Sequence, residues 1–168
     1  MNLISEFADL TMTQEIFHSS EPLTLESGEM LSQYHLAYTT YGQLNPEKSN
    51  VIWVVHALTG DSKAAEWWNG LIGEDKFFDP ANHFIICANL LGSNYGSSNP
   101  FSTNPETGEA YFYDFPQVTP RDLAASLEAL RIHLGLEKIH TLIGGSLGGQ
   151  VALEWAVTLG QKLKNAVI

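Results

Sequence analysis

Residues 142–156, LIGGSLGGQVALEWA, set one serine between two pairs of glycines, with an apolar run before them and an alanine-rich run after them. The first run has the composition of a buried strand, and the apolar residues after Ser146 recur every four positions, as on one face of a helix. The glycines and Ser146 fit the pattern G-x-S-x-G, in which a strand turns sharply into a helix and presents the serine at the carboxyl edge of a sheet. This stretch predicts an α/β fold with Ser146 as the candidate catalytic nucleophile.

The glycines around Ser146 have a steric explanation. A tight turn from strand to helix holds the serine in a strained backbone conformation, and side chains at positions 144 and 148 would collide with neighbouring elements. The turn also directs the first helical amides at the serine, so the Leu147 N–H is a candidate donor to an oxyanion formed there. Glycines that merely make a tight turn are the alternative.

A phosphate-binding loop is excluded at this position. The pattern G-x-G-x-x-G cannot be aligned with GGSLGG, and a Walker A loop requires a lysine where Gln150 follows Gly149. Ser146 is therefore placed for nucleophilic chemistry rather than for cradling a phosphate.

The rest of the chain alternates strands and helices. Three nearly continuous apolar runs are typical of strands buried on both faces, at residues 50–57, 83–91 and 138–145. A further strand is expected at residues 162–168, and β-rich segments at residues 14–20 and 31–42 predict antiparallel strands near the amino end. The sequence therefore predicts a mostly parallel central sheet with an antiparallel amino-terminal edge.

A helix is predicted between the second and third buried strands. Thr119 and Asp122 form a T-x-x-D capping pattern, with Pro120 in the first turn. Gly135 is expected to end the helix, because a left-handed residue is favoured there. Between these ends, leucines recur at intervals of three or four residues and form one apolar stripe: Leu123, Leu127, Leu130 and Leu134.

Composition narrows the class of protein. The chain has 8 Lys and Arg against 19 Asp and Glu, a formal net charge of −11, so no basic patch is expected to bind nucleic acid or an anionic membrane. The start lacks the basic end and long apolar run of a secretory signal, and no window approaches the length of a transmembrane helix. Cys87, the single cysteine, is expected to be a core residue rather than a nucleophile or metal ligand. No metal site is expected, and a reducing cytoplasm is the expected location.

A serine nucleophile requires a second oxyanion donor and a general base. Residues 54–62, VVHALTGDS, follow a buried strand where such a donor belongs, and the Leu58 N–H is the candidate partner of Leu147. His56 lies at the end of that strand, and we interpret it as a structural histidine bonded to nearby backbone. In folds with this serine turn, the catalytic histidine follows the nucleophile and an acid in chain order.

Several longer motifs resemble the homoserine O-acetyltransferase family. They occur in the family's order and cover most of the chain from about Leu36 onwards: HALTGDS at 56–62, WWNGLIGEDKFFDPANHFIICANLLGSNYGSSNP at 67–100, NPETGEAY at 104–111, DFPQVTPRDL at 114–123 and IGGSLGGQVALEWA at 143–156. The resemblance implies an α/β-hydrolase fold. The family usually has Met where this chain has Leu147, and Met-Gln where it has Gln150 and Val151. Leu147 offers the same amide, so these departures bear on the choice of acyl donor.

The resemblance also implies a reaction in two steps. Ser146 would attack the thioester of acetyl-CoA, and the homoserine hydroxyl would then attack the acetyl-serine to form O-acetylhomoserine, a step of methionine biosynthesis. Both oxyanions would lie on the Leu58 and Leu147 amides. The implied partners are homoserine and acetyl-CoA, the latter as co-substrate with no further cofactor, and family members are usually homodimers. A succinyl-CoA-dependent transferase, a serine esterase of the same fold and an inactive fragment are the alternatives.

The sequence supports a role in the site less strongly for four other side chains. Asn89 and Tyr95 lie in a loop after a strand's carboxyl end, where they either line the substrate pocket or only shape the loop. Trp67 and Trp68 are expected to form wall and core rather than substrate contacts.

The family's catalytic acid and histidine follow the nucleophile, together with its lid helices. This chain ends soon after the helix that follows Ser146, so we expect residues 1–168 to be the amino-terminal portion of one domain, without the lid and the carboxyl-terminal half. Asp114 precedes the serine and has the wrong chain order for the acid, while Asp61 and Glu154 are expected to be surface or capping charges. The chain alone is therefore expected to have no turnover.

Overall fold

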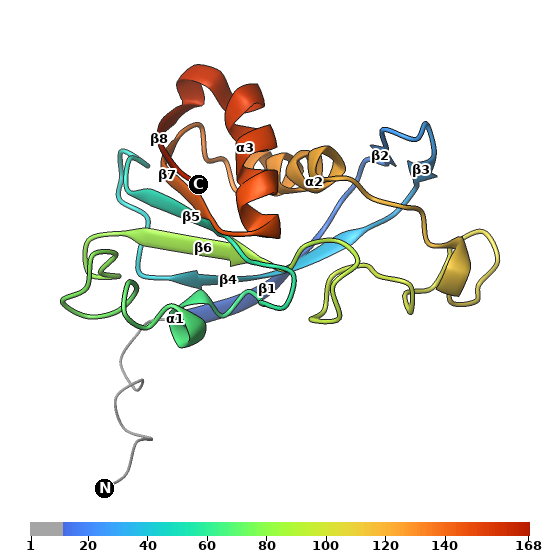
Figure 1. The fold of residues 1–168 in the computed structure, drawn as a ribbon, viewed down its shortest axis with the longest axis horizontal. Helices are drawn as coiled ribbons and strands as arrows, with labels where there is room; N and C mark the ends of the chain where they lie inside the picture. The colour runs from blue at the N-terminus through green and yellow to red at the C-terminus, as the bar shows by residue number, and fades with distance from the viewer. Residues whose placement is uncertain (1–11) are drawn as a thin grey trace, which may run out of the picture.

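A six-stranded sheet forms the centre of the molecule. The structure, a computed structural model, describes residues 12–168. Counted from one edge, the first three strands pair antiparallel (Figure 1). The third strand and the three beyond it run parallel to one another. The predicted mostly parallel sheet with an antiparallel amino-terminal edge is confirmed. The strands lie in the order β1 (Met12–His18), β4 (His35–Tyr41), β6 (Phe84–Ala88), β5 (Val51–Val55), β7 (Ile139–Gly144) and β8 (Leu163–Val167).

The antiparallel strand predicted within residues 31–42 is confirmed as β4, but it begins only at His35 because the chain bends before it. Leu31 belongs to β3 (Met30–Leu31), which pairs with β2 (Leu23–Thr24) in a separate two-stranded sheet. Leu31 and Tyr34 are both buried. Side chains alternate along a straight strand, so two residues three positions apart can face the same core only if the strand is interrupted.

Helices cover the two faces of the sheet unequally. α2 (Pro120–His133) and α3 (Leu147–Leu159) pack on one face, whereas α1 (Ala64–Trp67) lies on the other (Figure 1). The side chains of β5 alternate between two core clusters, one on each face. Because β5 is buried on both faces, it can be apolar at every position. Val51, Trp53 and Val55 join the cluster beneath α2 and α3, and Ile52 and Val54 join the other.

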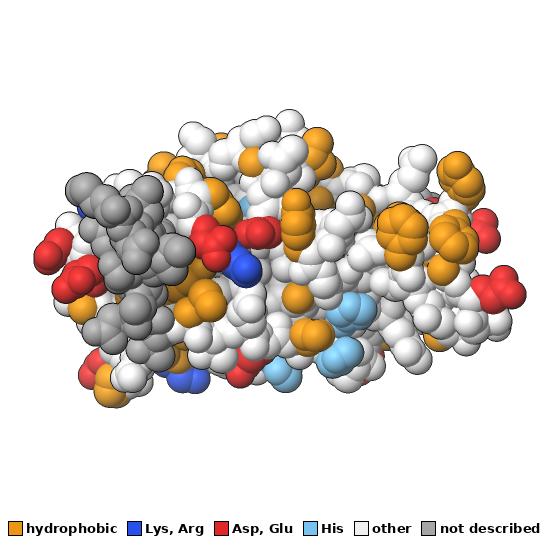
Figure 2. Space-filling model, turned by 90° about the horizontal axis from the view of Figure 1, so that it is seen from below, with side chains coloured by type: hydrophobic (Ala, Val, Ile, Leu, Met, Phe, Trp, Pro, Cys, Tyr) orange, Lys and Arg blue, Asp and Glu red, His pale blue; other side chains and the backbone are white. Residues whose placement is uncertain are grey.

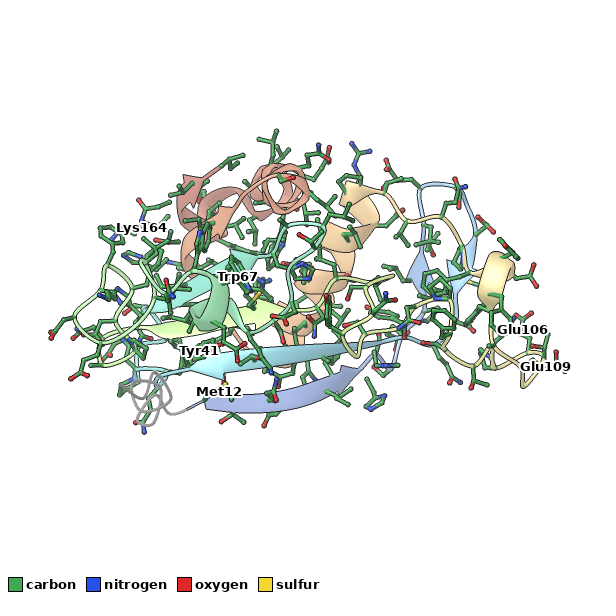
Figure 3. The ribbon with its side chains drawn as sticks, turned by 60° about the horizontal axis from the view of Figure 1, so that its bottom comes forward. Met12, Tyr41, Trp67, Glu106, Glu109 and Lys164 are labelled. Atoms are coloured by element: carbon green, nitrogen blue, oxygen red, sulfur yellow. The ribbon has the colours of Figure 1, made fainter. Side chains whose placement is uncertain are left out.

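A long loop, residues 89–119, separates β6 from α2. It contains the short 3-10 helix η1 (Phe112–Asp114); a second, η2 (Gly160–Lys162), follows α3. Glu106 and Glu109 lie at the outer end of this loop, away from the central sheet (Figure 3). On the face seen in Figure 2, acidic side chains outnumber basic ones, in keeping with the formal charge of −11.

Both ends of α2 are capped as the sequence predicts. Thr119 and Asp122 form a reciprocal capping box at the first turn. At the other end Gly135 adopts a φ of 62°, and the Leu136 N–H donates to the Arg131 carbonyl at 3.1 Å. This arrangement is a Schellman motif, which satisfies carbonyls that the end of a helix leaves without partners.

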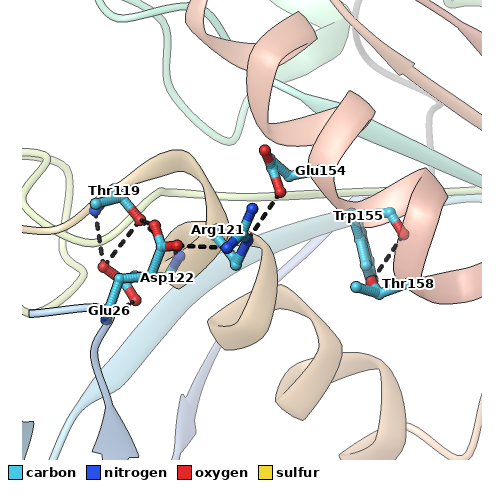
Figure 4. A network of polar contacts seen from close by, with 7 residues as sticks. All are labelled: Glu26, Thr119, Arg121, Asp122, Glu154, Trp155 and Thr158. Carbon is cyan, nitrogen blue, oxygen red and sulfur yellow. Dashed lines mark hydrogen bonds and ion pairs between the residues drawn. The ribbon is translucent and has the colours of Figure 1, made fainter. Parts of the chain in front are cut away.

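The β2–β3 hairpin is tied to the helices through polar contacts (Figure 4). Arg121 contacts Glu26 at 2.6 Å and Glu154 at 3.1 Å, but all three side chains are substantially exposed. Asp122 is 3% exposed, and its carboxylate accepts a hydrogen bond from the Glu26 N–H at 2.9 Å. Exposed ion pairs contribute little to stability, so the buried carboxylate is the stronger attachment.

A more buried ion pair lies within α2, and a hydrogen bond from Trp155 connects it to α3. Arg131, which is 4% exposed, donates to the two oxygens of Glu128 at 2.7 and 2.6 Å, and the Trp155 indole N–H donates to Glu128 at 3.0 Å. Burial by itself would raise the pKa of Glu128. The hydrogen bonds from Arg131 and Trp155, with the charges of Arg131 and Lys162, outweigh burial and hold the pKa below its usual value. Glu128 therefore stabilises the fold as a carboxylate.

We expect Glu128→Gln to lower the free energy of unfolding by about 2 kcal/mol near neutral pH, because it leaves buried Arg131 without its charged partner. Since the pKa of Glu128 is lower in the folded state, its contribution is complete above the unfolded-state pKa of about 4.3 and is lost as pH falls through the folded-state value. Urea unfolding at a series of pH values measures both effects. Glu154→Gln, at an exposed pair, should cost less than about 0.5 kcal/mol, and equal losses in the two variants would contradict the assignment.

Candidate active site

Ser146 lies at the turn between β7 and α3, at the carboxyl edge of the parallel strands. Its φ and ψ are 57° and −127°, a combination that residues with a side chain rarely adopt. The residue is exposed, and its hydroxyl forms no hydrogen bond within residues 12–168. The predicted strained conformation and projecting side chain are confirmed, while the role of Ser146 as a nucleophile stays a prediction.

The glycines on either side of Ser146 are required by close backbone contacts. A Cβ on Gly148 would collide with the carbonyl oxygen of Val55 and lie 2.7 Å from that of His56. A Cβ on Gly144 would collide with the carbonyl of Gly148. Both collisions are with backbone atoms, which cannot turn aside as a side chain can. The steric prediction for positions 144 and 148 is confirmed.

The two predicted oxyanion donors belong to segments that leave the carboxyl ends of the neighbouring strands β5 and β7. Leu147 is the first residue of α3, where N–H groups have no acceptor within the helix. Leu58 lies in the turn of residues 57–60, which closes through a 2.8 Å hydrogen bond from the Gly60 N–H to the Ala57 carbonyl. The contact of Gly148 with the end of β5 brings the start of α3 to the strand from which this turn emerges. The arrangement is compatible with the predicted pair of oxyanion donors, which stays a prediction.

His56 is a structural histidine, as predicted. It is 1% exposed; its Nδ1–H donates to the Ala57 carbonyl at 2.8 Å, and its Nε2 accepts from the Leu90 N–H at 3.0 Å. Burial lowers the pKa of His56, against the smaller opposing effects of the Ala57 hydrogen bond and the Asp61 charge. Both ring nitrogens of the neutral side chain are occupied, so His56 has no free lone pair to take a proton from Ser146.

Asn89 has contacts that support the second of its two predicted roles, shaping the loop. It is 3% exposed, and its Oδ1 accepts from the Ser62 N–H at 2.7 Å. Its Nδ2 donates to the Ser62 hydroxyl at 3.3 Å and to the Tyr95 carbonyl at 2.5 Å. Tyr95 itself is 51% exposed. Its ring is accessible to a ligand, whereas the polar atoms of Asn89 are engaged within the protein.

Two serines with structural contacts near the site were missed in the sequence. Ser62 is buried, and its hydroxyl lies 2.8 Å from the Thr39 hydroxyl. The Ser97 hydroxyl donates to the Asn89 carbonyl at 2.6 Å and accepts from the Ala37 N–H at 3.0 Å. The available signal was their place in the triplets GDS and GSS, because serines near glycine turns often bond to backbone.

None of the remaining candidates forms a hydrogen bond with Ser146 in the described part of the chain. Trp68 packs against the core cluster under α1, as predicted. Trp67, labelled in Figure 3, is 37% exposed, and its indole N–H donates to the Asp61 carbonyl at 3.1 Å. The Asp61 carboxylate accepts from the Lys63 N–H at 2.9 Å, which confirms it as a local capping charge. Glu154 is a surface charge, as predicted, and Asp114 is exposed in η1.

Cys87 is a core residue, as predicted. It is fully buried, and burial, together with the charge of Asp61, raises the pKa of its thiol. Within residues 12–168 there is no group of three or more His, Cys, Asp or Glu side chains that could hold a metal ion. No helix in this described part of the chain is long and apolar enough to cross a membrane.

Comparison with known proteins identifies the family. A family profile described as alpha/beta hydrolase fold matches residues 50–168, which include β5, β6, β7 and both long helices. The chain belongs to the alpha/beta hydrolase fold family. In alpha/beta hydrolases, a serine at a turn like that between β7 and α3 occupies the nucleophile elbow.

Curated relatives resemble the chain over most of its length. The homoserine O-acetyltransferase of Cyclobacterium marinum is 64% identical over 168 residues, which are all of this chain and 48% of that protein. The homoserine O-acetyltransferase of Chlorobaculum parvum is 50% identical over 139 residues, 83% of this chain and 39% of that protein. The chain therefore spans about half, or less, of the length of these relatives.

Solved alpha/beta hydrolase structures with different activities share the fold. The homoserine O-acetyltransferase from Bacillus anthracis superimposes with a TM-score of 0.84 at 33% identity, over 92% of this chain and 43% of that one. Esterase E22 superimposes with a TM-score of 0.79 at 32% identity, over 86% of this chain and 44% of that one. The fold alone therefore does not separate transferases from esterases.

We expect Gly148→Ala to lower the free energy of unfolding by about 3 kcal/mol or to prevent folding, because its Cβ would meet two backbone carbonyls. Gly145→Ala is the matched control: its Cβ would have no atom within 4 Å, so the change should stay below about 1 kcal/mol. Denaturant unfolding followed by circular dichroism measures the difference. Equal effects at positions 145 and 148 would show that the close contact is not required.

We expect Ser146→Gly to be more stable than Ser146→Ala by about 1 kcal/mol. Glycine adopts the backbone conformation of position 146 without strain, and this gain exceeds its greater entropy in the unfolded chain. Ala125→Gly at an exposed position of α2 should have the opposite sign and cost about 1 kcal/mol. Thermal unfolding of the three variants tests the difference, and a less stable Ser146→Gly would argue against strain at the elbow.

Proposed function

We propose that this chain provides the nucleophile and oxyanion site of a homoserine O-acetyltransferase. The observation that carries the proposal is an exposed, strained Ser146 at the nucleophile elbow of a chain 64% identical, over its whole length, to the Cyclobacterium marinum protein of that name. The fold alone supports any serine acyltransferase or hydrolase, so the choice of homoserine and acetyl-CoA as substrates rests on the relatives.

The proposed reaction uses Ser146 as a temporary acyl carrier. Its Oγ attacks the thioester carbonyl carbon of acetyl-CoA, the C–S bond breaks, and CoA leaves as a thiol with the serine proton. The homoserine hydroxyl then attacks the acetyl-serine, the bond to Oγ breaks, and the proton of the attacking hydroxyl returns to Ser146. In both steps the Leu58 and Leu147 N–H groups stabilise the oxyanion.

Proton transfer in both steps requires a general base at Ser146. Among the described residues no histidine contacts the Ser146 hydroxyl, and His56 is held by Ala57 and Leu90. We therefore propose that the chain by itself has no turnover. Acetyl-CoA as the only co-substrate, homodimeric assembly and a cytoplasmic location belong to the same proposal.

Ester hydrolysis is the second candidate. The fold is shared with esterase E22, so it supports ester hydrolysis as well as transfer. An esterase and this transferase share formation of the acyl-serine and differ in whether water or an alcohol receives the acyl group. Transfer therefore depends on excluding water from the acyl-serine.

The test joins this chain to the part of the Cyclobacterium marinum protein that follows the matched region. We expect homoserine-dependent release of CoA from acetyl-CoA, reduced at least about 1,000-fold by Ser146→Ala. Ser126→Ala, which removes a buried hydroxyl of α2 bonded to the Leu123 carbonyl, should leave turnover unchanged. The unjoined chain should release no CoA above background.

Each alternative has its own result in this assay. Faster hydrolysis of p-nitrophenyl acetate than transfer to homoserine would favour the esterase. Faster release of CoA from succinyl-CoA than from acetyl-CoA would show that the acyl donor is succinyl-CoA. Full activity of the joined protein with Ser146→Ala would overturn the assignment of the nucleophile.

A further inference from the structure

The loop that carries Leu58, residues 56–62, is attached at both ends to the loop that follows β6. At one end the Leu90 N–H donates to His56 Nε2 at 3.0 Å, and at the other the Ser62 N–H donates to Asn89 Oδ1 at 2.7 Å. Leu58 lies between these attachments, and its side chain is 74% exposed. An exposed side chain cannot anchor its own backbone by packing. Besides the Gly60–Ala57 turn bond and the Trp67 bond to the Asp61 carbonyl, the two attachments are therefore the contacts that fix the ends of the loop.

The first attachment depends on which nitrogen of His56 carries the proton. The Ala57 carbonyl can only accept a hydrogen bond, so Nδ1, 2.8 Å away, must carry the hydrogen. Nε2 then has a lone pair for the Leu90 N–H. Burial favours this neutral form. The ring therefore joins the end of β5 to the end of β6 without a buried charge.

The second attachment is part of a buried polar network. Asn89 Nδ2 donates to the Ser62 hydroxyl and to the Tyr95 carbonyl, while the Ser97 hydroxyl donates to the Asn89 carbonyl. Ser62, Asn89 and Ser97 are each less than 5% exposed. A satisfied buried network of this kind holds one geometry, because any rotation leaves polar groups without partners.

We propose that His56 and Asn89 are positioning residues for the oxyanion site, which clamp both ends of loop 56–62 and so set the direction of the Leu58 N–H. The inference rests on the proposed function, because it takes Leu58 as an oxyanion donor. Neither side chain touches the reacting atoms. Their effect is on transition-state stabilisation, where a misplaced donor costs up to about 100-fold in rate.

The structural test uses the 168-residue chain and nitrogen-15 NMR. We expect His56→Ala and Asn89→Ala to shift the Leu58 amide signal and to speed its hydrogen exchange. His56→Gln, whose side-chain oxygen can replace Nε2 as the acceptor for Leu90, should restore part of the wild-type signal. Asn99→Ala is the matched control, because it removes bonds to the Ser93 and Ser97 carbonyls and from the Phe101 N–H in the same long loop but none to residues 56–62. It should leave the Leu58 signal unchanged.

The kinetic test uses the joined transferase described above. His56→Ala and Asn89→Ala should each lower kcat roughly 10- to 100-fold with KM changed less than about 3-fold, because an oxyanion donor acts mainly in the transition state. Asn99→Ala should change neither constant by more than about 3-fold. Unchanged kcat in both positioning variants, or an equal loss in Asn99→Ala, would overturn the inference.

An acid titration of the unaltered chain keeps the proposal testable if the variants fail to fold. Protonation of Nε2 removes the acceptor for Leu90, so the Leu58 and Leu90 amides should shift together with the His56 ring nitrogens. The other titratable groups that face His56 are the Asp61 carboxylate and the Cys87 thiol, and Asp61→Asn removes the carboxylate as a control. A Leu58 amide signal that does not shift when His56 is protonated would overturn the proposal. An inactive joined protein would instead refute the proposed function and leave the NMR result decisive for the clamp.

Discussion

The contact between the backbone of Gly148 and the carbonyls of Val55 and His56 is the constraint on which the site depends. It lets α3 begin directly against the carboxyl end of β5, with no side chain between helix and sheet. The strand that precedes α3 must then turn sharply, and Ser146 absorbs that turn in a conformation that costs energy. Packing of α3 offsets this cost. It includes an edge-to-face contact of Trp155 with Trp53, whose ring centroids are 4.8 Å apart.

The parallel arrangement of β5, β6 and β7 brings segments far apart in the sequence to one edge of the sheet. Parallel strands end at the same edge of a sheet, so the segments after β5, β6 and β7 converge there. The loop after β5 presents the Leu58 amide, the loop after β6 holds it, and the turn after β7 presents Ser146. Leu90 and Leu91 anchor the start of the loop after β6 in the core, and buried hydrogen bonds connect that loop to the loop of Leu58.

Sequence reasoning was most successful where local rules and burial agree. The capping box at Thr119 and the glycine end at Gly135 are local patterns whose geometry depends on a few residues. It failed at residues 31–34, where the core selects two apolar side chains that a straight strand cannot place on the same face. For Asn89 the residue type allowed two roles, and only its partners in space distinguish between them.

The sequence by itself determined the alternation of buried strands with the two long helices, the antiparallel edge, and the requirement for glycine at positions 144 and 148, because these follow from local periodicity and steric exclusion. It also located the turn from strand to helix at Ser146 and its neighbour Leu147, which are contiguous in the chain. Only the tertiary structure decided that His56 is neutral with both nitrogens occupied, and that Asn89 holds the loop of Leu58. The physical reason is that hydrogen-bond partners contributed by different strands are a property of sheet topology, which no local stretch of the chain contains.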